Sequence, residues 1–321
     1  MDTEPALGRL PLVDFDHQPR TRLVFGNGAV ETVGELCLEC GAGKILIVTD
    51  PGIVRAGHVH HVLQALDRAG LSYAVYDRVR ENPTTKDVAE CLAFAQAEKI
   101  DFFLGLGGGS SMDTAKGCNF LLTNGGEIKD YWGVGKASKA MHPLIAIPTT
   151  SGTGSECQSF ALIAEESSHL KMACGDPKAA AIAAILDPKL TVSQPRAVTA
   201  NTGIDAIAHA VETAVTKKRN PLSLMYSHEA FKLCVTSLPK VLANPDDLES
   251  RGKMLLGAAY AGTAIENSML GAAHAAANPL TAHCNTVHGT AVGMMLPLVI
   301  RYNSEDSTAL QGYAELASAP E

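Results

Sequence analysis

The sequence has few aromatic residues, few charges and no long uncharged apolar run. Aromatic residues make up 5% and charged residues 19% of the 321 positions, and 26 Lys and Arg against 34 Asp and Glu leave a net charge of −8. No basic run alternates with aromatic residues, so the chain lacks the positive surface that follows a phosphate backbone, and we expect no nucleic-acid partner. No stretch is long and uncharged enough to span a bilayer, so we expect no membrane insertion.

Cysteine is also sparse, with eight residues scattered along the chain apart from Cys37 and Cys40. A chain of this length needs no disulfide staples, and such usage is typical of a reducing compartment. The first twenty residues are polar, acidic and contain proline, unlike a signal or transit peptide. We therefore expect a cytoplasmic protein. Cys37 and Cys40 have CxxC spacing, but they come late in a predicted helix before the first strong strand, which favours packing over redox chemistry.

Apolar residues make up 46% of the chain, enough for a large core and, at this length, for two domains. Continuous apolar runs, which are typical of strands buried on both faces, alternate with helical segments; the runs are 44–50, 73–77, 101–107, 143–150 and 180–187. This alternation predicts a doubly wound parallel sheet of the Rossmann-like kind.

The strand signal disappears after Pro188. Helical spacing then predicts helices around residues 201–216, 222–242, 248–266 and 286–302, with breaks at Asn220-Pro221 and Asn244-Pro245, where proline disfavours continuation. The sequence therefore predicts an α/β domain over residues 1–192 and an all-α domain over residues 193–321.

The run GLGGGSSMDTAK (105–116) follows a predicted buried strand and opens a predicted helix. Gly107, Gly108 and Gly109 let the backbone approach an anion, and the helix points its positive end at the same place. We favour pyrophosphate binding over a simple tight turn, because three glycines exceed what a turn requires. Asp113, placed in the first helical turn, has compensation of the helix dipole as its alternative role.

Two further features are compatible with a nucleotide site. Asp50 ends the first predicted strand, where a carboxylate can bind a ribose diol and repel a 2′-phosphate, although an Asp before Pro51 also forms turns. The segment PTTSGTGSE (148–156) follows the fourth apolar run with small and hydroxyl residues that either line a ligand or form an ordinary loop.

One pair of residues has a spacing that suits either a metal site or a local contact, and the local contact is the more usual of the two. Asp205 and His209 are four residues apart, which places both on one helix face, where they either bind one divalent cation or form a local hydrogen-bonded pair. By contrast, we expect the cluster His58, His60 and His61 to lie on a solvated helix face. His283 lies nine positions after His274 and is expected at the surface or behind a ligand.

Four segments occur in an order and at separations that resemble the iron-containing, group III alcohol dehydrogenases: GGGSSMDTAK (107–116), PTTSGTGSE (148–156), GIDAIAHAVE (203–212) and HAAANPLTAHCNTVHGTAVGMMLPLVIRYN (274–303). The resemblance extends from about Arg22 to Ala317. It implies an NAD(P)-binding domain, a helical domain and a cleft between them that holds metal and substrate. The implied activity is a metal-dependent, NAD(P)-linked alcohol dehydrogenase or aldehyde reductase with a small alcohol or aldehyde substrate.

The resemblance also implies roles for individual residues. The metal ligands would be Asp205, His209, His274 and His288, with Fe²⁺ as the ion and Zn²⁺ as its alternative. The cofactor would be NAD rather than NADP, because of Asp50, and its contacts would be Asp50, Asn82, Gly107, Gly108, Gly109, Ser110, Asp113, Thr149, Thr153 and Lys171. The metal would polarise the alcohol or carbonyl oxygen during hydride transfer. A homo-oligomer is also implied.

The sequence departs from the family in two ways. Asn278 stands where many members have a histidine assigned to proton transfer, and an amide cannot shuttle a proton, so no protein acid or base is assigned. Family members also continue through further C-terminal helices, so the helical domain is expected to be incomplete. A hydroxyacid–oxoacid transhydrogenase of the same family and an inactive, truncated nucleotide-binding member are the alternative functions.

Overall fold

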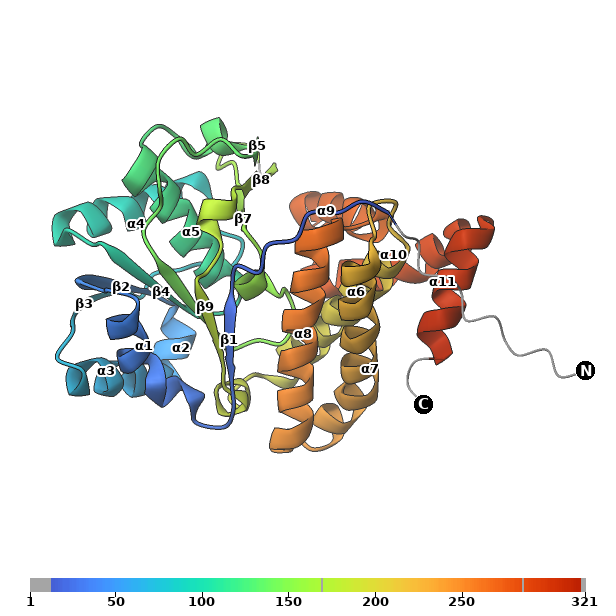
Figure 1. Ribbon diagram of the computed structural model, residues 1–321, viewed down its shortest axis with the longest axis horizontal. Helices are drawn as coiled ribbons and strands as arrows, with labels where there is room; N and C mark the ends of the chain where they lie inside the picture. Colours follow the sequence, from blue (N-terminus) through green and yellow to red (C-terminus); the bar gives the residue numbers. More distant parts are fainter. Residues whose placement is uncertain (1–12, 169, 285, 319–321) are drawn as a thin grey trace, which may run out of the picture.

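The computed structural model describes residues 13–168, 170–284 and 286–318, which form a sheet-containing part followed by a helical part (Figure 1). The strands of the large sheet are β1 (Arg22–Phe25), β2 (Lys44–Val48), β3 (Ser72–Tyr76), β4 (Phe102–Gly107), β6 (Leu144–Pro148) and β9 (Ala183–Leu186). They lie in the order β1-β9-β6-β4-β2-β3, and each neighbouring pair is parallel. The predicted parallel, Rossmann-like sheet is confirmed.

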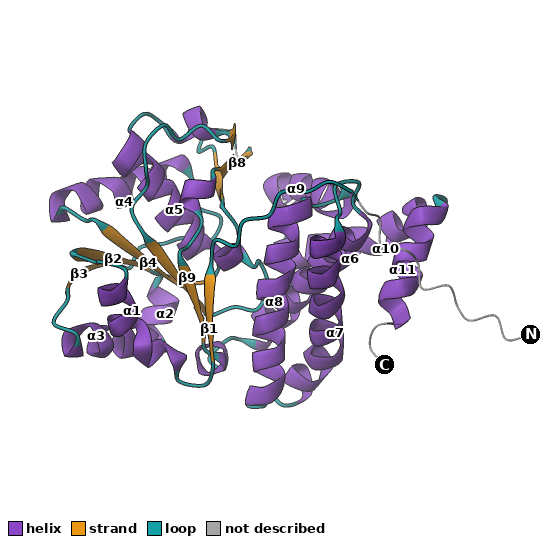
Figure 2. Ribbon diagram, viewed as in Figure 1, coloured by secondary structure: helices purple, strands orange, loops and turns teal. Residues whose placement is uncertain are grey.

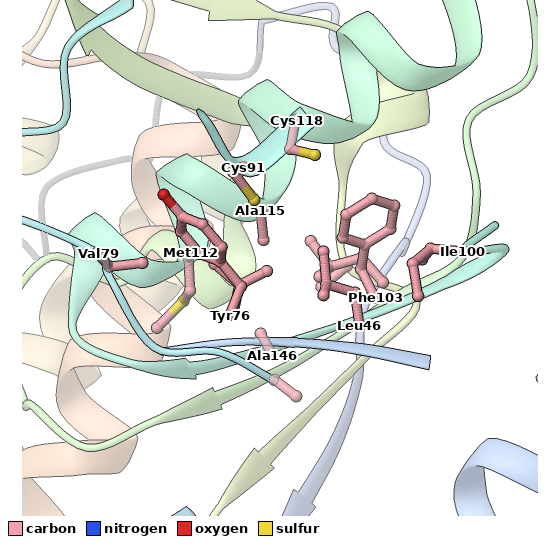
Figure 3. Close-up of a cluster of buried hydrophobic side chains, with 14 of the residues drawn as sticks. Leu46, Tyr76, Val79, Cys91, Ile100, Phe103, Met112, Ala115, Cys118 and Ala146 are labelled. Carbon is pink, nitrogen blue, oxygen red and sulfur yellow. The ribbon is translucent and has the colours of Figure 1, made fainter. Parts of the chain in front are cut away.

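Alternate residues of each central strand pack on opposite faces of this sheet. Ile45 and Ile47 of β2 face α1 (Val33–Glu39) and α3 (His58–Arg68), whereas Leu46 and Val48 face α4 (Thr85–Glu98) and α5 (Gly109–Asn124). Figure 3 shows the apolar side chains on the second face, where Leu46 lies beneath the helices. Both faces are apolar because each is covered by helices, as Figure 2 shows, which explains the continuous apolar runs.

The sequence did not predict β1 or a second, smaller sheet. The small sheet has the order β5-β8-β7, formed by β5 (Gly133–Val134), β7 (Phe160–Ala164) and β8 (Lys171–Gly175), and β7 and β8 are antiparallel. β1 is a mostly exposed edge strand, and the strands of the small sheet contain glycine, lysine or exposed residues. None of them has the uncharged, fully buried run that marks the central strands.

The helical part comprises α6 (Arg196–Val215), α7 (Pro221–Ala243), α8 (Leu248–Ser268), α9 (Ala272–Cys284), α10 (His288–Asn303) and α11 (Ser307–Ser318). The predicted break at Asn220 is confirmed, because its side chain accepts hydrogen bonds from Leu222 N and Ser223 N and so caps α7. α8 packs next to β9, and its Leu255 shares a core with Leu186 (Figure 1).

Short elements complete the fold: α2 (Pro51–Arg55) and the 3₁₀ turns η1 (Ala29–Thr32), η2 (Ile128–Tyr131), η3 (Ser155–Cys157), η4 (Pro177–Ala179) and η5 (Pro188–Thr191). β9 ends at Leu186 and α6 begins at Arg196, so the boundary at residues 192–193 falls in the connecting segment, and residues 1–12 of the first domain lie outside the described residues. The division into two domains stays a prediction.

Among the described residues, no helix has both the length and the apolar character to cross a membrane.

Candidate metal and cofactor site

The turn between β4 and α5 contains two glycines that tight packing requires. Gly107 has a φ of +146°, and a Cβ atom there would lie 2.4 Å from Ser111 Oγ. A Cβ atom on Gly109, the first residue of α5, would lie 2.8 Å from Thr153 Cγ2. The tight-turn explanation therefore accounts for these two positions.

Gly108 is different. Its φ is −81°, which any residue adopts, and a Cβ atom there would meet only Thr150, at the ordinary contact distance of 3.4 Å. Neither conformation nor packing demands glycine, so close approach of a ligand to the backbone is the remaining physical reason for it. The start of α5 presents N–H groups that have no partner within the helix, as an anion site requires.

Asp50 forms the turn considered from the sequence, and its second carboxylate oxygen faces the glycine turn; its contact with a ribose stays a prediction. Its Oδ1 accepts hydrogen bonds from Gly52 N at 2.7 Å and Ile53 N at 3.1 Å and so caps α2. Its Oδ2 faces the glycine turn, because a Cβ atom on Gly107 would lie 3.5 Å from it. One carboxylate oxygen therefore maintains the turn while the other is directed toward the place where a nucleotide would lie.

Other expected cofactor residues surround the same turn. Asn82, with a left-handed φ of 52°, donates its backbone N–H to Ser110 Oγ at 3.2 Å. Thr149 is buried and donates its N–H to the carbonyl of Gly107 at 2.9 Å. Thr153 Oγ1 accepts a hydrogen bond from Ser155 N at 3.3 Å. The structure thus brings together segments from four separate parts of the chain.

Asp113 does not compensate the dipole of α5. It lies beyond the first turn, which contains no acidic residue, so that explanation is wrong. Its Oδ1 accepts a hydrogen bond from Ser155 Oγ at 3.2 Å. Burial raises the pKa of Asp113 to about 6, although the ammonium groups of Lys116 and Lys171 act in the opposite direction. Asp113 therefore joins α5 to the hydroxyl-rich loop.

Lys171 connects the nucleotide side with the histidine cluster. It lies in β8, and burial lowers the pKa of its ammonium group, while the carboxylates of Asp113 and Asp205 favour the charged form. Its charge also acts on His288. The charge of Lys171 therefore acts on groups of α5, α6 and α10.

Four side chains from three helices converge around one oxygen of Asp205. Asp205 and His209 lie one turn apart on α6, His274 lies on α9, and His288 begins α10. The Nε2 atoms of the three histidines lie 3.6, 3.2 and 3.7 Å, respectively, from Asp205 Oδ1. The ligand atoms of Asp205, His209 and His274 all lie within 4.8 Å of one another.

The local pair considered from the sequence is not formed. The distance of 3.6 Å between Asp205 Oδ1 and His209 Nε2 is too long for a hydrogen bond, and Asp205 instead bonds His274 at 3.2 Å. Gly289, which follows His288, lets the start of α10 approach α6 closely, because a Cβ atom on Gly289 would lie 2.1 Å from the carbonyl oxygen of Asn201 on α6. The cluster is therefore built from contacts between distant helices.

The charges of the cluster are strongly coupled. Burial alone would raise the pKa of Asp205, but the three imidazoles around it outweigh burial and keep it below its ordinary value. Burial lowers the pKa of His209 to about 4. Burial also opposes a charge on His274, but the carboxylates of Asp205 and Glu212 outweigh it and raise the pKa to about 9. Positive charge in this cluster is therefore stabilised chiefly by the carboxylates.

The donor set fits a divalent transition metal. Three imidazole nitrogens and a carboxylate oxygen from largely buried side chains suit Fe²⁺ or Zn²⁺, and Nδ1 of both His209 and His288 is buried without a hydrogen-bond partner among the described residues. His288 has 28% of its side chain exposed, against 5–7% for Asp205, His209 and His274. The cluster is thus open to solvent at His288.

The other histidines and cysteines considered from the sequence, and Asn278, have surroundings of their own. His283 and Asn278 are exposed. His58 is buried and its Nε2 lies 2.6 Å from Ser193 Oγ, so its expected place on a solvated face is wrong; only His60 and His61 are exposed. Cys37 is fully buried in the core beside α3, in agreement with packing.

Two residues within the quoted motifs had no role assigned from the sequence. Lys116 ends GGGSSMDTAK and is fully buried, and its Nζ donates to three carbonyls and one hydroxyl of residues 155–160. Glu212 ends GIDAIAHAVE and accepts a hydrogen bond from His274 Nδ1. Helical spacing puts Glu212 seven residues after Asp205 and thus on the same face of α6, a signal that was available.

Comparison with known proteins gives consistent results. A model of iron-containing alcohol dehydrogenase matches residues 19–188, and one of the C-terminal part of the Fe-containing alcohol dehydrogenase family matches residues 199–319. Alcohol dehydrogenase 4 of Schizosaccharomyces pombe is 37% identical, with 92% of this chain and 70% of that protein covered. An NAD-dependent methanol dehydrogenase of Bacillus methanolicus is also 37% identical, with 87% and 74% covered.

The fold has a similarly close match. The crystal structure of a 1,3-propanediol oxidoreductase superimposes with a TM-score of 0.91 at 32% identity, covering 95% of this chain and 80% of that one. Sequence and fold therefore agree over both the sheet-containing and the helical part.

Proposed function

The chain belongs to the family of iron-containing alcohol dehydrogenases, and we propose that Asp205, His209, His274 and His288 hold its iron while the glycine turn holds NAD. It is a metal-dependent, NAD-linked alcohol dehydrogenase or aldehyde reductase. The observation that carries the residue assignment is the convergence of three Nε2 atoms within 3.7 Å of one oxygen of Asp205.

The metal, when bound, supplies a Lewis acid that makes an alcohol more acidic or a carbonyl more electrophilic. The protein's part is to hold the four donor atoms in place and to leave the side at His288 open, where substrate and water reach the cluster. Asn278 is exposed and is an amide, so we assign the exchange of the hydroxyl proton to water at this open side.

The nucleotide side orients the cofactor. The start of α5 would offer backbone N–H groups to the pyrophosphate at Gly108, and Asp50, whose Oδ2 faces the glycine turn, would accept from the ribose of NAD and repel a 2′-phosphate. Lys171, whose charge is favoured by the carboxylates of both Asp113 and Asp205, would supply positive charge to the nucleotide side and to the metal cluster. NAD held by these residues would supply the hydride acceptor or donor, and the protein's part is to hold the cofactor and the substrate in place.

We also propose a homo-oligomeric, cytoplasmic enzyme. The eight cysteines, which all lie within the described residues, are free thiols, as a reducing compartment predicts. β1 is an edge strand with Leu23 36% and Phe25 50% exposed, which makes it available for contact with a second copy. The mass of the protein in solution, measured by light scattering, tests this: a monomer at all concentrations would contradict it.

The activity is tested by following NADH oxidation with a panel of short aldehydes after anaerobic addition of Fe²⁺. We expect turnover that requires the metal and is slower with NADPH. Replacing Asp50 by Asn, which keeps a cap for α2 but removes the charge, should narrow the difference between the two cofactors. Protein that binds both metal and NAD and reduces no aldehyde would overturn the proposal.

A further inference from the structure

Glu212 is a buried carboxylate directly behind one of the histidines of the cluster. It lies on α6, three residues after His209, and is 3% exposed. Its Oε2 accepts a hydrogen bond from His274 Nδ1, and its Oε1 accepts one from the backbone N–H of Ala273 at 2.6 Å. One carboxylate thus contacts both the ring of His274 and the beginning of α9.

These contacts determine which nitrogen of His274 faces the cluster. Nε2 lies 3.2 Å from Asp205 Oδ1, on the side of the other histidines, so Nδ1 is directed away from them. An ionised carboxylate only accepts hydrogen bonds, so Nδ1 carries a proton directed at Glu212, and Nε2 carries one directed at Asp205. A cation bound by Nε2 would replace the proton on that nitrogen and leave the proton on Nδ1. Nδ1 of His209 and of His288, by comparison, has no such partner within the described residues.

The backbone leaves space for this carboxylate. A Cβ atom on Gly271, just before α9, would lie 2.8 Å from Glu212 Oε1 and 3.3 Å from its Cδ. Any larger residue at this position would displace the carboxylate, the start of α9 or both. The position of Glu212 therefore depends on the glycine that precedes the helix carrying His274.

We propose that Glu212 is a positioning residue for the metal site: it fixes His274 with the proton on Nδ1 and holds the ring so that Nε2 is presented to the ion. This inference rests on the proposed metal site and adds to it a fifth side chain that does not touch the ion. A carboxylate behind a ligand histidine orients the ring and increases its basicity, and its loss weakens metal affinity about 10–100-fold.

The test is a titration of the metal-free protein with Zn²⁺ against a chromophoric chelator, because Zn²⁺ has no redox chemistry. Glu212→Gln cannot accept from both Ala273 N–H and His274 Nδ1–H, so we expect Zn²⁺ to bind about 10–100-fold more weakly. The matched control is Glu266→Gln, because Glu266 on α8 also uses both carboxylate oxygens, accepting from Ser159 N at 2.9 Å and from Ser159 Oγ at 2.7 Å, and it accepts a third hydrogen bond from Arg20 at 3.2 Å. We expect its Zn²⁺ affinity to stay within about threefold of the original, because none of the hydrogen-bond partners of Glu266 within the described residues belongs to the metal cluster.

A second readout separates positioning from a purely structural role. In the Zn²⁺-loaded protein, proton NMR should show the Nδ1–H of His274 as a downfield, slowly exchanging signal that Glu212→Gln shifts upfield. Unchanged Zn²⁺ affinity together with an unchanged Nδ1–H signal in Glu212→Gln would overturn the proposal. If circular dichroism shows that this variant does not fold, Gly271→Ala decides: weaker Zn²⁺ binding supports the proposal, and unaltered binding refutes it.

The failure of this inference is distinguishable from failure of the proposed site. If Asp205→Ala binds Zn²⁺ as tightly as the original protein, the metal site itself is wrong, and Glu212 loses its role with it. If Asp205→Ala loses Zn²⁺ but Glu212→Gln does not, only the positioning role is wrong.

Discussion

Replacing Lys116 by Met tests how the cofactor loop is held. Lys116 is fully buried on α5, and its Nζ donates to the Ser155 carbonyl at 2.7 Å, to Ser155 Oγ and the Phe160 carbonyl at 3.0 Å, and to the Gln158 carbonyl at 2.8 Å. Methionine keeps most of the apolar stem but removes the charge and all four hydrogen bonds. The loop after β6 would then lose its connection to the helix that begins at the glycine turn.

The magnitude follows from these contacts. A hydrogen bond to a charged group contributes about 1.5–3 kcal/mol, but four bonds from one ammonium group are not additive. Removal of one partner of a buried charged network costs about 3–5 kcal/mol, and we expect the free energy of unfolding to fall by this amount. A loosened loop should also weaken NAD binding, since Thr153 packs on Gly109.

Lys178→Met is the matched control. Lys178 Nζ also donates to a carbonyl, of Ala137 at 3.0 Å, and to Asp176 Oδ1 at 3.1 Å, but its side chain is 43% exposed. Its loss should cost about 1 kcal/mol or less. Urea denaturation measures the unfolding of both variants, and calorimetry measures NAD affinity. If Lys116→Met were no less stable than Lys178→Met, the argument from burial would be refuted.

Two further predictions concern the nucleotide side. Gly108→Ala should change the free energy of unfolding by no more than about 0.5 kcal/mol, because the new Cβ atom would meet Thr150 only at 3.4 Å. Its affinity for NAD, measured by calorimetry, should fall about tenfold or more. An unchanged affinity for NAD would favour the simple turn. Burial raises the pKa of Glu156 from 4.5 to about 7, against the effect of Lys116. Because the folded state binds the proton of Glu156 more tightly than the unfolded state does, this proton stabilises the fold fully below pH 4.5. The stabilisation is lost as the pH rises through about 7. Glu156→Gln removes that loss, so its free energy of unfolding relative to the original protein should rise by roughly 3 kcal/mol between pH 4.5 and 8. A difference independent of pH would contradict the buried, raised-pKa state of Glu156.

The central strands of the large sheet and the long helices could be predicted because their signals are local. Strands buried on both faces require uninterrupted apolar residues, and Asn220 beside Pro221 marks a helix start through contacts within three residues. The small sheet could not be predicted in this way, because β8 carries Lys171 and ends at Gly175. Its strands are held by pairing with each other, which no local pattern records.

The candidate site shows the same division. The spacing of Asp205 and His209 indicates a shared helix face, but only the fold shows that His274, more than sixty residues on, approaches Asp205. The same holds for Glu212, which meets His274 across 62 residues of sequence. His58 was misplaced because its partner, Ser193, is 135 residues away. Long-range contacts of this kind leave no periodic trace in the sequence.

The most direct test of the account is the metal content of purified protein after reconstitution with Fe²⁺, measured together with aldehyde reduction, for the original chain and for alanine variants of Asp205, His209, His274 and His288. His283→Ala serves as control, since His283 is exposed on the same helix as His274. We predict about one ion per chain in the original protein and in the control. Each of the four variants should lose most of its metal and its turnover while remaining folded. An Asp205→Ala or His274→Ala protein that kept both its full metal content and its turnover would contradict the account.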